Sequence, residues 1–374
     1  MNPSISLGRI AGIQIGLNWS WLVVFALIVW TLATGVFPSQ NPGLSDGTYA
    51  AMGVAAAALF FGSILLHEVG HAVQAQREGM EIEGITLWLF GGVARFRGMF
   101  PSAGAELRIA LAGPAVSFLL GGLFIVLALA LPGPAQVDGV AAWIGYINWF
   151  LLLFNLIPAL PLDGGRVLRA LLWYRRGDFL SATRAAAGGG RGFGYVLIGT
   201  GVLLVLLAQD IGGLWLVFLG WFLLGAAQAE LQAVIAHEAL GGLRVRDLMA
   251  REPVTTTPGI TLGRFMDEIV WPNRYTTYPV VDDGHPVGLL PFRRVAEIPR
   301  HEWDERHVAD CMLVLDEVPV LDGDMPAADA LQQLAASPTR RALVVEDGRL
   351  VGILSVTDLV RAIETPRPRP RRPV

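Results

Sequence analysis

One apolar run, interrupted by two histidines and a glutamate, decides how the rest of the chain is interpreted: Phe60-Phe61-Gly62-Ser63-Ile64-Leu65-Leu66-His67-Glu68-Val69-Gly70-His71-Ala72-Val73. On a helix, His67 and His71 lie one turn apart and point the same way. Two imidazoles at that spacing can hold one metal ion. Glu68 follows the first histidine, where a carboxylate can take a proton from a metal-bound water. This H-E-x-x-H motif predicts a metal site.

The surroundings of the motif make this prediction more specific. The residues before it, from about Ala51, are almost wholly apolar and long enough to form the first part of a membrane span of about 20 residues. Ionisable side chains at membrane depth are costly and usually mark function. The alternative is that the three polar residues only pair with one another inside a helical bundle.

The composition places most of this apolar character in the first part of the chain. Hydrophobic residues make up 53% of the 374 residues and charged residues 16%, and charge rises sharply after about residue 235. This balance fits a membrane protein with a soluble part. A net charge of -4 gives no indication of nucleic-acid binding. The single cysteine, Cys311, excludes an intramolecular disulfide and a cysteine-rich zinc site.

Six apolar segments are long enough to predict membrane spans, and the first is read as retained rather than as a cleaved signal peptide. They cover roughly 17–36, 51–76, 106–131, 141–160, 194–209 and 213–235. The glycine-rich stretch 188–194 is interpreted as a loop before the fifth span. We therefore expect a polytopic α-helical membrane protein with about six spans, a small membrane-associated β-hairpin and a soluble α/β module.

The arginines of the loops predict the orientation of these spans. The loops at about 37–50, 132–140 and 209–213 contain no arginine, whereas the intervening segments contain Arg77, Arg95, Arg97 and Arg108, and then Arg166, Arg169, Arg175, Arg176, Arg184 and Arg191. Because arginine favours the cytoplasmic side, both termini are expected in the cytoplasm of a multi-pass plasma-membrane protein. His67 then lies about 16 residues into the second span, or roughly 24 Å, near the cytoplasmic face.

A third metal ligand is expected, because a catalytic zinc usually has three protein ligands and one open position. The other four histidines and Cys311 all lie beyond the spans. Asp163 follows the fourth span at a depth similar to that of His67. Pro158 and Pro161 break the helix before it. The alternative, an ordinary Asp-Gly turn at the end of a span, stays open on spacing alone.

These two motifs together resemble the site-2 protease family of intramembrane zinc metalloproteases. The resemblance rests on His67-Glu68-Val69-Gly70-His71 and on Asn155-x-x-Pro158-x-x-Pro161-Leu162-Asp163-Gly164-Gly165, and it covers roughly residues 1–235. It implies one zinc ion per chain, bound by His67, His71 and Asp163. It also implies Glu68 as the general base and Asn155 as a residue that holds substrate or stabilises the oxyanion.

The expected substrate is a transmembrane segment of another protein. A substrate helix hides its peptide bonds in its own hydrogen bonds, so it has to unwind before attack, and an edge strand can hold the unwound segment. The stretch Gly84–Phe96 reads as two short strands around Gly91-Gly92, and it resembles the family's membrane-associated sheet. It is predicted to be either a substrate clamp or a plain cytoplasmic hairpin.

The part of the chain after about residue 243 contains an internal repeat. Tyr278-Pro-Val-Val-Asp-Asp-Gly-His-Pro-Val-Gly288 aligns with Ala342-Leu-Val-Val-Glu-Asp-Gly-Arg-Leu-Val-Gly352. The repeat resembles a tandem pair of cystathionine-β-synthase (CBS) domains, expected at 243–300 and 308–364. Residues 365–374 are rich in proline and arginine and are expected to form a disordered tail.

The CBS resemblance implies adenine-nucleotide binding, as AMP or ATP. Ser355, Thr357 and Asp358 match the positions that hold phosphate and ribose in such domains, whereas Arg294 stands in the first repeat where Asp358 stands in the second. At most one nucleotide is therefore expected. Thr357 and Asp358 can also serve as a helix N-cap. A homodimer through these domains stays open.

We expect an intramembrane zinc endopeptidase that performs regulated intramembrane proteolysis, with CBS domains that regulate it. Two other functions stay open. A nucleotide-gated channel or transporter would account for the CBS pair but not for the two metal-ligand motifs. A catalytically silent zinc receptor would bind the ion but would have no need of Glu68.

Overall fold

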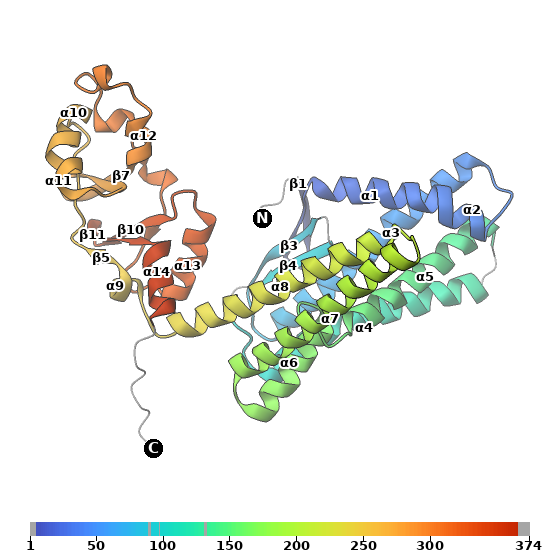
Figure 1. Cartoon of the computed structure of the whole chain (residues 1–374). Coiled ribbons are helices and arrows are strands. Elements are labelled where there is room, and N and C mark those ends of the chain that lie inside the picture. The colour runs from blue at the N-terminus through green and yellow to red at the C-terminus, as the bar shows by residue number, and fades with distance from the viewer. Residues whose placement is uncertain (1–4, 89–90, 97, 131–132, 366–374) are drawn as a thin grey trace. The chain divides into compact units, whose positions relative to one another are not determined.

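The computed structural model describes residues 5–88, 91–96, 98–130 and 133–365, and these form two compact units, Met1–Leu231 and Gln232–Val374 (Figure 1). The two units are considered separately below.

Long apolar helices make up most of the first unit, and six of the described helical segments are long and apolar enough to cross a membrane. The first begins with α1 (Ser20–Thr31) and ends with α2 (Phe37–Gln40). The other five are α3 (Asp46–Arg77), α4 (Ala103–Ala130), α5 (Ala135–Asn155), α7 (Phe179–Leu207) and α8 (Gly213–Leu240). The expectation of six spans and of a polytopic helical membrane protein is confirmed.

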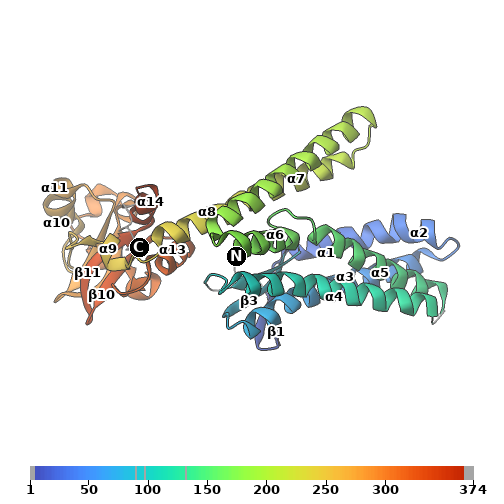
Figure 2. The same ribbon diagram turned by 90° about the horizontal axis from the view of Figure 1, so that it is seen from below.

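Small residues let these helices approach one another closely, and both views show α3, α4 and α5 side by side (Figures 1 and 2). A Cβ atom on Gly70 of α3 would come within 2.9 Å of Val116 in α4, and one on Gly145 of α5 would come within 2.6 Å of Ile125 in α4. Such contacts are typical of membrane helices, which associate by close packing.

The glycine-rich stretch 188–194 is helical, so the interpretation of it as a loop is wrong. It lies inside α7, where a Cβ atom on Gly190 would come within 2.0 Å of the Leu160 carbonyl oxygen, and one on Gly194 within 3.0 Å of the Gly220 carbonyl oxygen in α8. Glycine is needed here for close contact with neighbouring backbone, and the surrounding helix outweighs its low helical propensity.

A four-stranded sheet with the order β1-β2-β3-β4 accompanies the helices of the first unit. Its strands are β1 (Ile5–Ile10), β2 (Ile13–Leu17), β3 (Ile82–Trp88) and β4 (Gly91–Phe96), with β2 parallel to β3 and the other pairs antiparallel. The predicted hairpin is present as β3 and β4. Gly91 and Gly92 belong to β4, where they pair with Trp88 and Leu87, and not to a turn as expected.

The end of α3 is tied to α4 by a bidentate ion pair. Arg108 donates two hydrogen bonds of 2.7 Å to the carboxylate of Glu78, which directly follows α3. These hydrogen bonds lower the pKa of Glu78 to about 2. The pair therefore stays ionised over the physiological pH range.

The second unit contains two repeats that exchange short strands. Strand β5 (Ala250–Arg251) belongs to the first repeat but pairs with β11 (Arg349–Ser355) of the second, and β8 (Leu313–Val314) belongs to the second repeat but pairs with β7 (His285–Pro291) of the first. The remaining strands are β6 (Thr277–Asp282), β9 (Val320–Leu321) and β10 (Arg341–Glu346), and the helices are α9 (Val245–Leu248), α10 (Leu262–Phe265), α11 (Trp271–Asn273), α12 (Phe292–Ala296), α13 (Ala327–Ala336) and α14 (Val356–Glu364).

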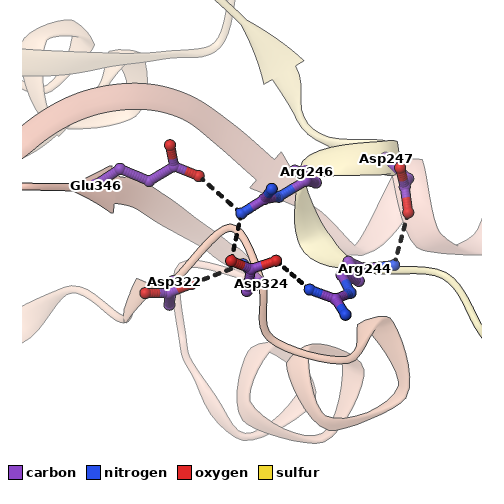
Figure 3. Close-up of polar contacts among 6 residues, drawn as sticks. All are labelled: Arg244, Arg246, Asp247, Asp322, Asp324 and Glu346. Atoms are coloured by element: carbon purple, nitrogen blue, oxygen red, sulfur yellow. Dashed lines mark hydrogen bonds and ion pairs between the residues drawn. The ribbon is translucent and has the colours of Figure 1, made fainter.

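Ion pairs reinforce this exchange (Figure 3). Arg246, from α9, contacts Asp324 at 2.5 Å and Glu346 of β10 at 3.5 Å. Arg244 also pairs with Asp324. Because the side chains of these pairs are about half exposed, most of the stabilisation comes from the apolar core beneath them, where Leu240 and Val245 pack with buried residues of the second repeat. The predicted tail, 365–374, lies outside the described residues except for Thr365.

Because each repeat supplies a strand to the other, neither repeat should fold alone. We expect residues 243–307 and 308–365, expressed separately, to show no cooperative unfolding transition in urea, and residues 232–365 to unfold in one transition. Circular dichroism checks both. A cooperative transition in either isolated repeat would contradict this account.

Candidate metal centre

Three buried side chains from two separate helices meet at one point. His67 and His71 come from α3 and Asp163 from α6 (Asp163–Arg176), and their exposed fractions are 4%, 3% and 7%. The two Nε2 atoms lie 3.1 Å apart, and each lies 3.2 Å from Oδ2 of Asp163. The sequence-predicted ligand set is therefore assembled in space, and within the described residues it is the group of histidine and acidic side chains that could hold a metal ion.

The hydrogen bonds made by the Nδ1 atoms of the two rings determine which form of each Nε2 atom faces Asp163. Nδ1 of His71 lies 2.7 Å from the Ile109 carbonyl oxygen, which can only accept, so Nδ1 donates to it and, when the ring is neutral, Nε2 is the atom that presents a lone pair. Nδ1 of His67 contacts Oγ of Ser117 at 2.9 Å. The lone pair of His71 thus faces a carboxylate oxygen, and this contact needs a proton or a cation to be stable.

This donor set fits a zinc ion. Two imidazole nitrogens and one carboxylate oxygen are the ligands of many catalytic zinc sites, and a tetrahedral ion holds neighbouring donors about 3.3 Å apart.

Helix α4 forms the wall behind the rings, which the sequence analysis did not foresee. A Cβ atom on Gly113 would come within 2.2 Å of Nε2 of His71 and 2.6 Å of Nε2 of His67. Ile109, Gly113 and Ser117 are spaced by four, so they share one face of α4. The small residues at 113 and 117 form a small-xxx-small pattern, which is the signal that could have indicated this close approach.

Glu68 is half-buried and lies against the sheet. A Cβ atom on Gly92 of β4 would come within 2.3 Å of Cγ of Glu68, so strand and carboxylate are in direct contact. This contact joins the predicted base to the predicted hairpin, which sequence reasoning treated as separate features.

A folded-back loop positions Asp163. Helix α5 ends at Asn155, five residues before the end predicted for the fourth span, and Pro158 and Pro161 lie in the loop before α6. Cβ atoms on Gly164 and Gly165 would come within 2.2 Å of the Leu156 carbonyl oxygen and 2.3 Å of the Leu160 nitrogen. Both glycines are needed because the loop packs directly on the first turn of α6.

Asn155 closes α5 and is partly exposed. Among the residues that the structure describes, its amide has no hydrogen-bond partner, so it is free to contact a ligand.

The residues predicted to bind a nucleotide lie at the start of α14. Ser355 is the N-cap: its Oγ accepts from the Asp358 backbone nitrogen at 3.3 Å, and Oδ2 of Asp358 accepts from the Ser355 backbone nitrogen at 3.0 Å. Thr357 is exposed. In the first repeat, Arg294 donates to the carbonyl oxygens of Cys311 and Met312. The capping interpretation applies to Ser355 and Asp358, and of the three residues only Thr357 is exposed.

Comparisons with known proteins agree with this geometry. The model of peptidase family M50 matches residues 55–139 and 133–198, and the CBS-domain model matches 245–300 and 308–365. A relative from Mycobacterium tuberculosis, named "Putative zinc metalloprotease Rip3", is 39% identical over 372 residues, which cover 98% of this chain and 94% of the relative. "Zinc metalloprotease MJ0392" from Methanocaldococcus jannaschii is 32% identical over 363 residues, 97% of each chain.

A solved structure, the site-2 protease from Methanocaldococcus jannaschii, is 30% identical and aligns with 60% of this chain and 94% of its own, with a TM-score of 0.43. The identity of the full-length relatives, together with the two family models, is sufficient to assign the family. The chain therefore belongs to peptidase family M50, the site-2 protease family of zinc metalloproteases, and carries two CBS domains in its C-terminal part.

Proposed function

We propose that this chain is an intramembrane zinc endopeptidase that hydrolyses peptide bonds in or near transmembrane segments of other membrane proteins. The observation that carries the proposal is the convergence of two imidazole nitrogens and one carboxylate oxygen, 3.1 to 3.2 Å apart, on helices of a membrane-spanning unit. His67, His71 and Asp163 would hold the ion. Bound there, zinc acts as a Lewis acid that polarises the substrate carbonyl and makes water a better nucleophile.

Glu68 is the general base of this proposal. It takes the proton of the attacking water and returns it to the nitrogen of the leaving amine. Its contact with Gly92 keeps the carboxylate on the side of the sheet. The hydrogen bonds of His67 to Ser117 and of His71 to the Ile109 carbonyl hold the rings in position.

The edge strand β4 would hold the substrate. Within the described sheet β4 pairs only with β3, so its other edge is open to an extended segment. Because Gly92 touches Glu68, a segment added to β4 passes beside the base. The amide of Asn155 is free to hydrogen-bond the substrate backbone as well.

The arginine distribution supports an orientation with both termini in the cytoplasm of a plasma-membrane protein, and cleavage would then release a cytoplasmic fragment. Functionally, residues 1–235 would be the protease domain, and 243–300 and 308–364 the regulatory CBS domains. The second repeat would bind one adenine nucleotide, AMP or ATP, through Thr357 and the first turn of α14. A homodimer through this unit is compatible with the proposal.

The central experiment compares Glu68→Gln and Asp163→Ala with the wild type in detergent. Glu68→Gln should keep about one zinc ion per chain and lose about 10²- to 10⁴-fold in cleavage of a helical membrane substrate, because only the proton acceptor is removed. Asp163→Ala should lose zinc, because one of three ligands is removed. Metal analysis and a cleavage assay measure both.

The rival functions give different outcomes in the same assay. A wild type without zinc, even after the metal is supplied, contradicts the protease and favours a channel or transporter. Zinc at full occupancy without cleavage across a substrate panel favours a receptor.

Two glycine substitutions should separate metal binding from base positioning. Gly113→Ala places a methyl group on both imidazoles and should abolish zinc binding. Gly92→Ala pushes only on Glu68 and should lower kcat at least about tenfold while zinc stays bound. Gly122→Ala on α4 is the matched control, since a Cβ atom there meets nothing within 4 Å. If Gly92→Ala lost zinc and Gly113→Ala kept it, this assignment of the two glycines would be wrong.

Nucleotide binding should depend on Thr357. Thr357→Val removes an exposed hydroxyl without touching the cap, so AMP or ATP affinity should fall about tenfold with the melting temperature unchanged. Asp358→Ala should instead also destabilise the unit, by about 1 kcal/mol, because the cap is lost. Isothermal titration calorimetry and thermal melts distinguish the two. Unchanged affinity in Thr357→Val would remove Thr357 from the site.

A further inference from the structure

Helix α6 carries two arginines one turn apart, and within the described part of the chain only Arg169 has hydrogen-bond or ion-pair partners. Arg169 is fully buried: its guanidinium lies 2.6 Å from Oε1 of Glu106 and 2.9 Å from Oε1 of Glu230. Its central carbon also lies 5.0 Å from the ring centre of Phe179. Arg169 therefore has a structural explanation, since it joins α6 to α4 and α8.

Arg166, one turn closer to Asp163, has no such explanation. Its Nε atom is buried without a hydrogen-bond partner, and among the described residues no ion pair is formed by its guanidinium. A buried guanidinium nitrogen without a hydrogen-bond partner is costly, because it loses its hydration without replacement. Such a group in a folded protein suggests a partner that the chain itself does not supply.

The position of Arg166 indicates where that partner lies. Arg166 follows Asp163 by three residues, so both lie on one face of α6. Its charge interacts with those of Glu230, Asp163, Glu106 and Glu68, and the predicted ligand and base are therefore among its neighbours. A guanidinium presents five N–H groups in a fixed fork, which suits an oxyanion or a carboxylate.

Peptide hydrolysis produces these two anionic groups in succession. Negative charge develops first on the carbonyl oxygen in the transition state, and the new C-terminus of the amino-terminal fragment then carries a carboxylate. Fixed donors aimed at such charge contribute strongly when they need no reorganisation.

We propose that Arg166 is a further catalytic residue that binds the carbonyl oxygen of the cleaved bond and then the carboxylate of the amino-terminal product. This inference rests on the proposed protease function. The other explanation is that Arg166 only balances the negative charge of the nearby carboxylates, without touching substrate.

The test compares Arg166→Gln and Arg166→Lys with the wild type, using exposed Arg176→Gln near the end of α6 as the control. Arg166→Gln should lower kcat about 10²- to 10³-fold with KM nearly unchanged and zinc retained, because the interaction is made in the transition state. Arg166→Lys should recover part of kcat, since it keeps the charge but not the fork. Arg176→Gln should behave as the wild type.

A second measurement needs no variant. The amino-terminal product peptide with a free carboxylate should inhibit the wild type at least about tenfold more strongly than the same peptide with a C-terminal amide, and Arg166→Gln should lose most of that difference. Equal inhibition of the wild type by both peptides overturns the proposal, as does an Arg166→Gln enzyme with unchanged kcat or with lost zinc. None of these results affects the protease function, which fails if the wild type takes up no zinc or if the zinc-loaded wild type cuts nothing.

Discussion

Three side chains whose ligand atoms converge on one buried point are the constraint on which the membrane unit depends. His67, His71 and Asp163 can be held 3.1 to 3.2 Å apart only if a positive charge lies among them or if the surrounding structure forces them together. Two neighbouring elements have glycines that allow these side chains to come so close. Helix α4 supplies a glycine where the rings approach, and the first turn of α6 supplies glycines where the preceding loop folds back onto it.

Buried ion pairs next to the metal centre fix the helix that carries Asp163. Arg169 connects Glu106 of α4 with Glu230 of α8, so the helix that begins with Asp163 is fixed one and a half turns further along. Such a network is costly to bury and strongly destabilising to break by halves, which makes it a device for specifying position more than for adding stability. Arg166 lies on the same helix but, among the described residues, has none of those partners. Arg169 therefore fixes the position of the helix, whereas Arg166 has N–H donors that no protein group in the described part of the chain uses.

Local patterns predicted the features that depend on a few neighbouring residues. The spacing of His67 and His71, the six apolar segments and the repeat near residues 278 and 342 were all of this kind. Contacts between distant segments were not predictable. Strands β1 and β2 were missed because each has only five or six residues with weak alternation, and β2 becomes recognisable as a strand only through its pairing with β3. The stretch 188–194 was misread because its glycines pack against backbone more than twenty residues away. Gly92 carries no signal of its own until Glu68 is placed beside it, and Gly113 carries only its small-xxx-small spacing with Ser117, which does not identify the imidazoles as its neighbours.

The pairing of β2 with β3 has a consequence for how the chain is inserted into the membrane. Gly16 lies opposite Thr86, and the chain between them contains two membrane-spanning segments. Two strands that share hydrogen bonds must lie on the same side of the bilayer, so the sheet can form only if the chain has crossed twice, an even number of times. A protein inserted with one crossing missing would have its two halves of the sheet on opposite sides. The edge strand β4 beside Glu68 would then belong to a sheet that lacks β1 and β2, and a wrongly inserted protease would be unable to bind a substrate segment.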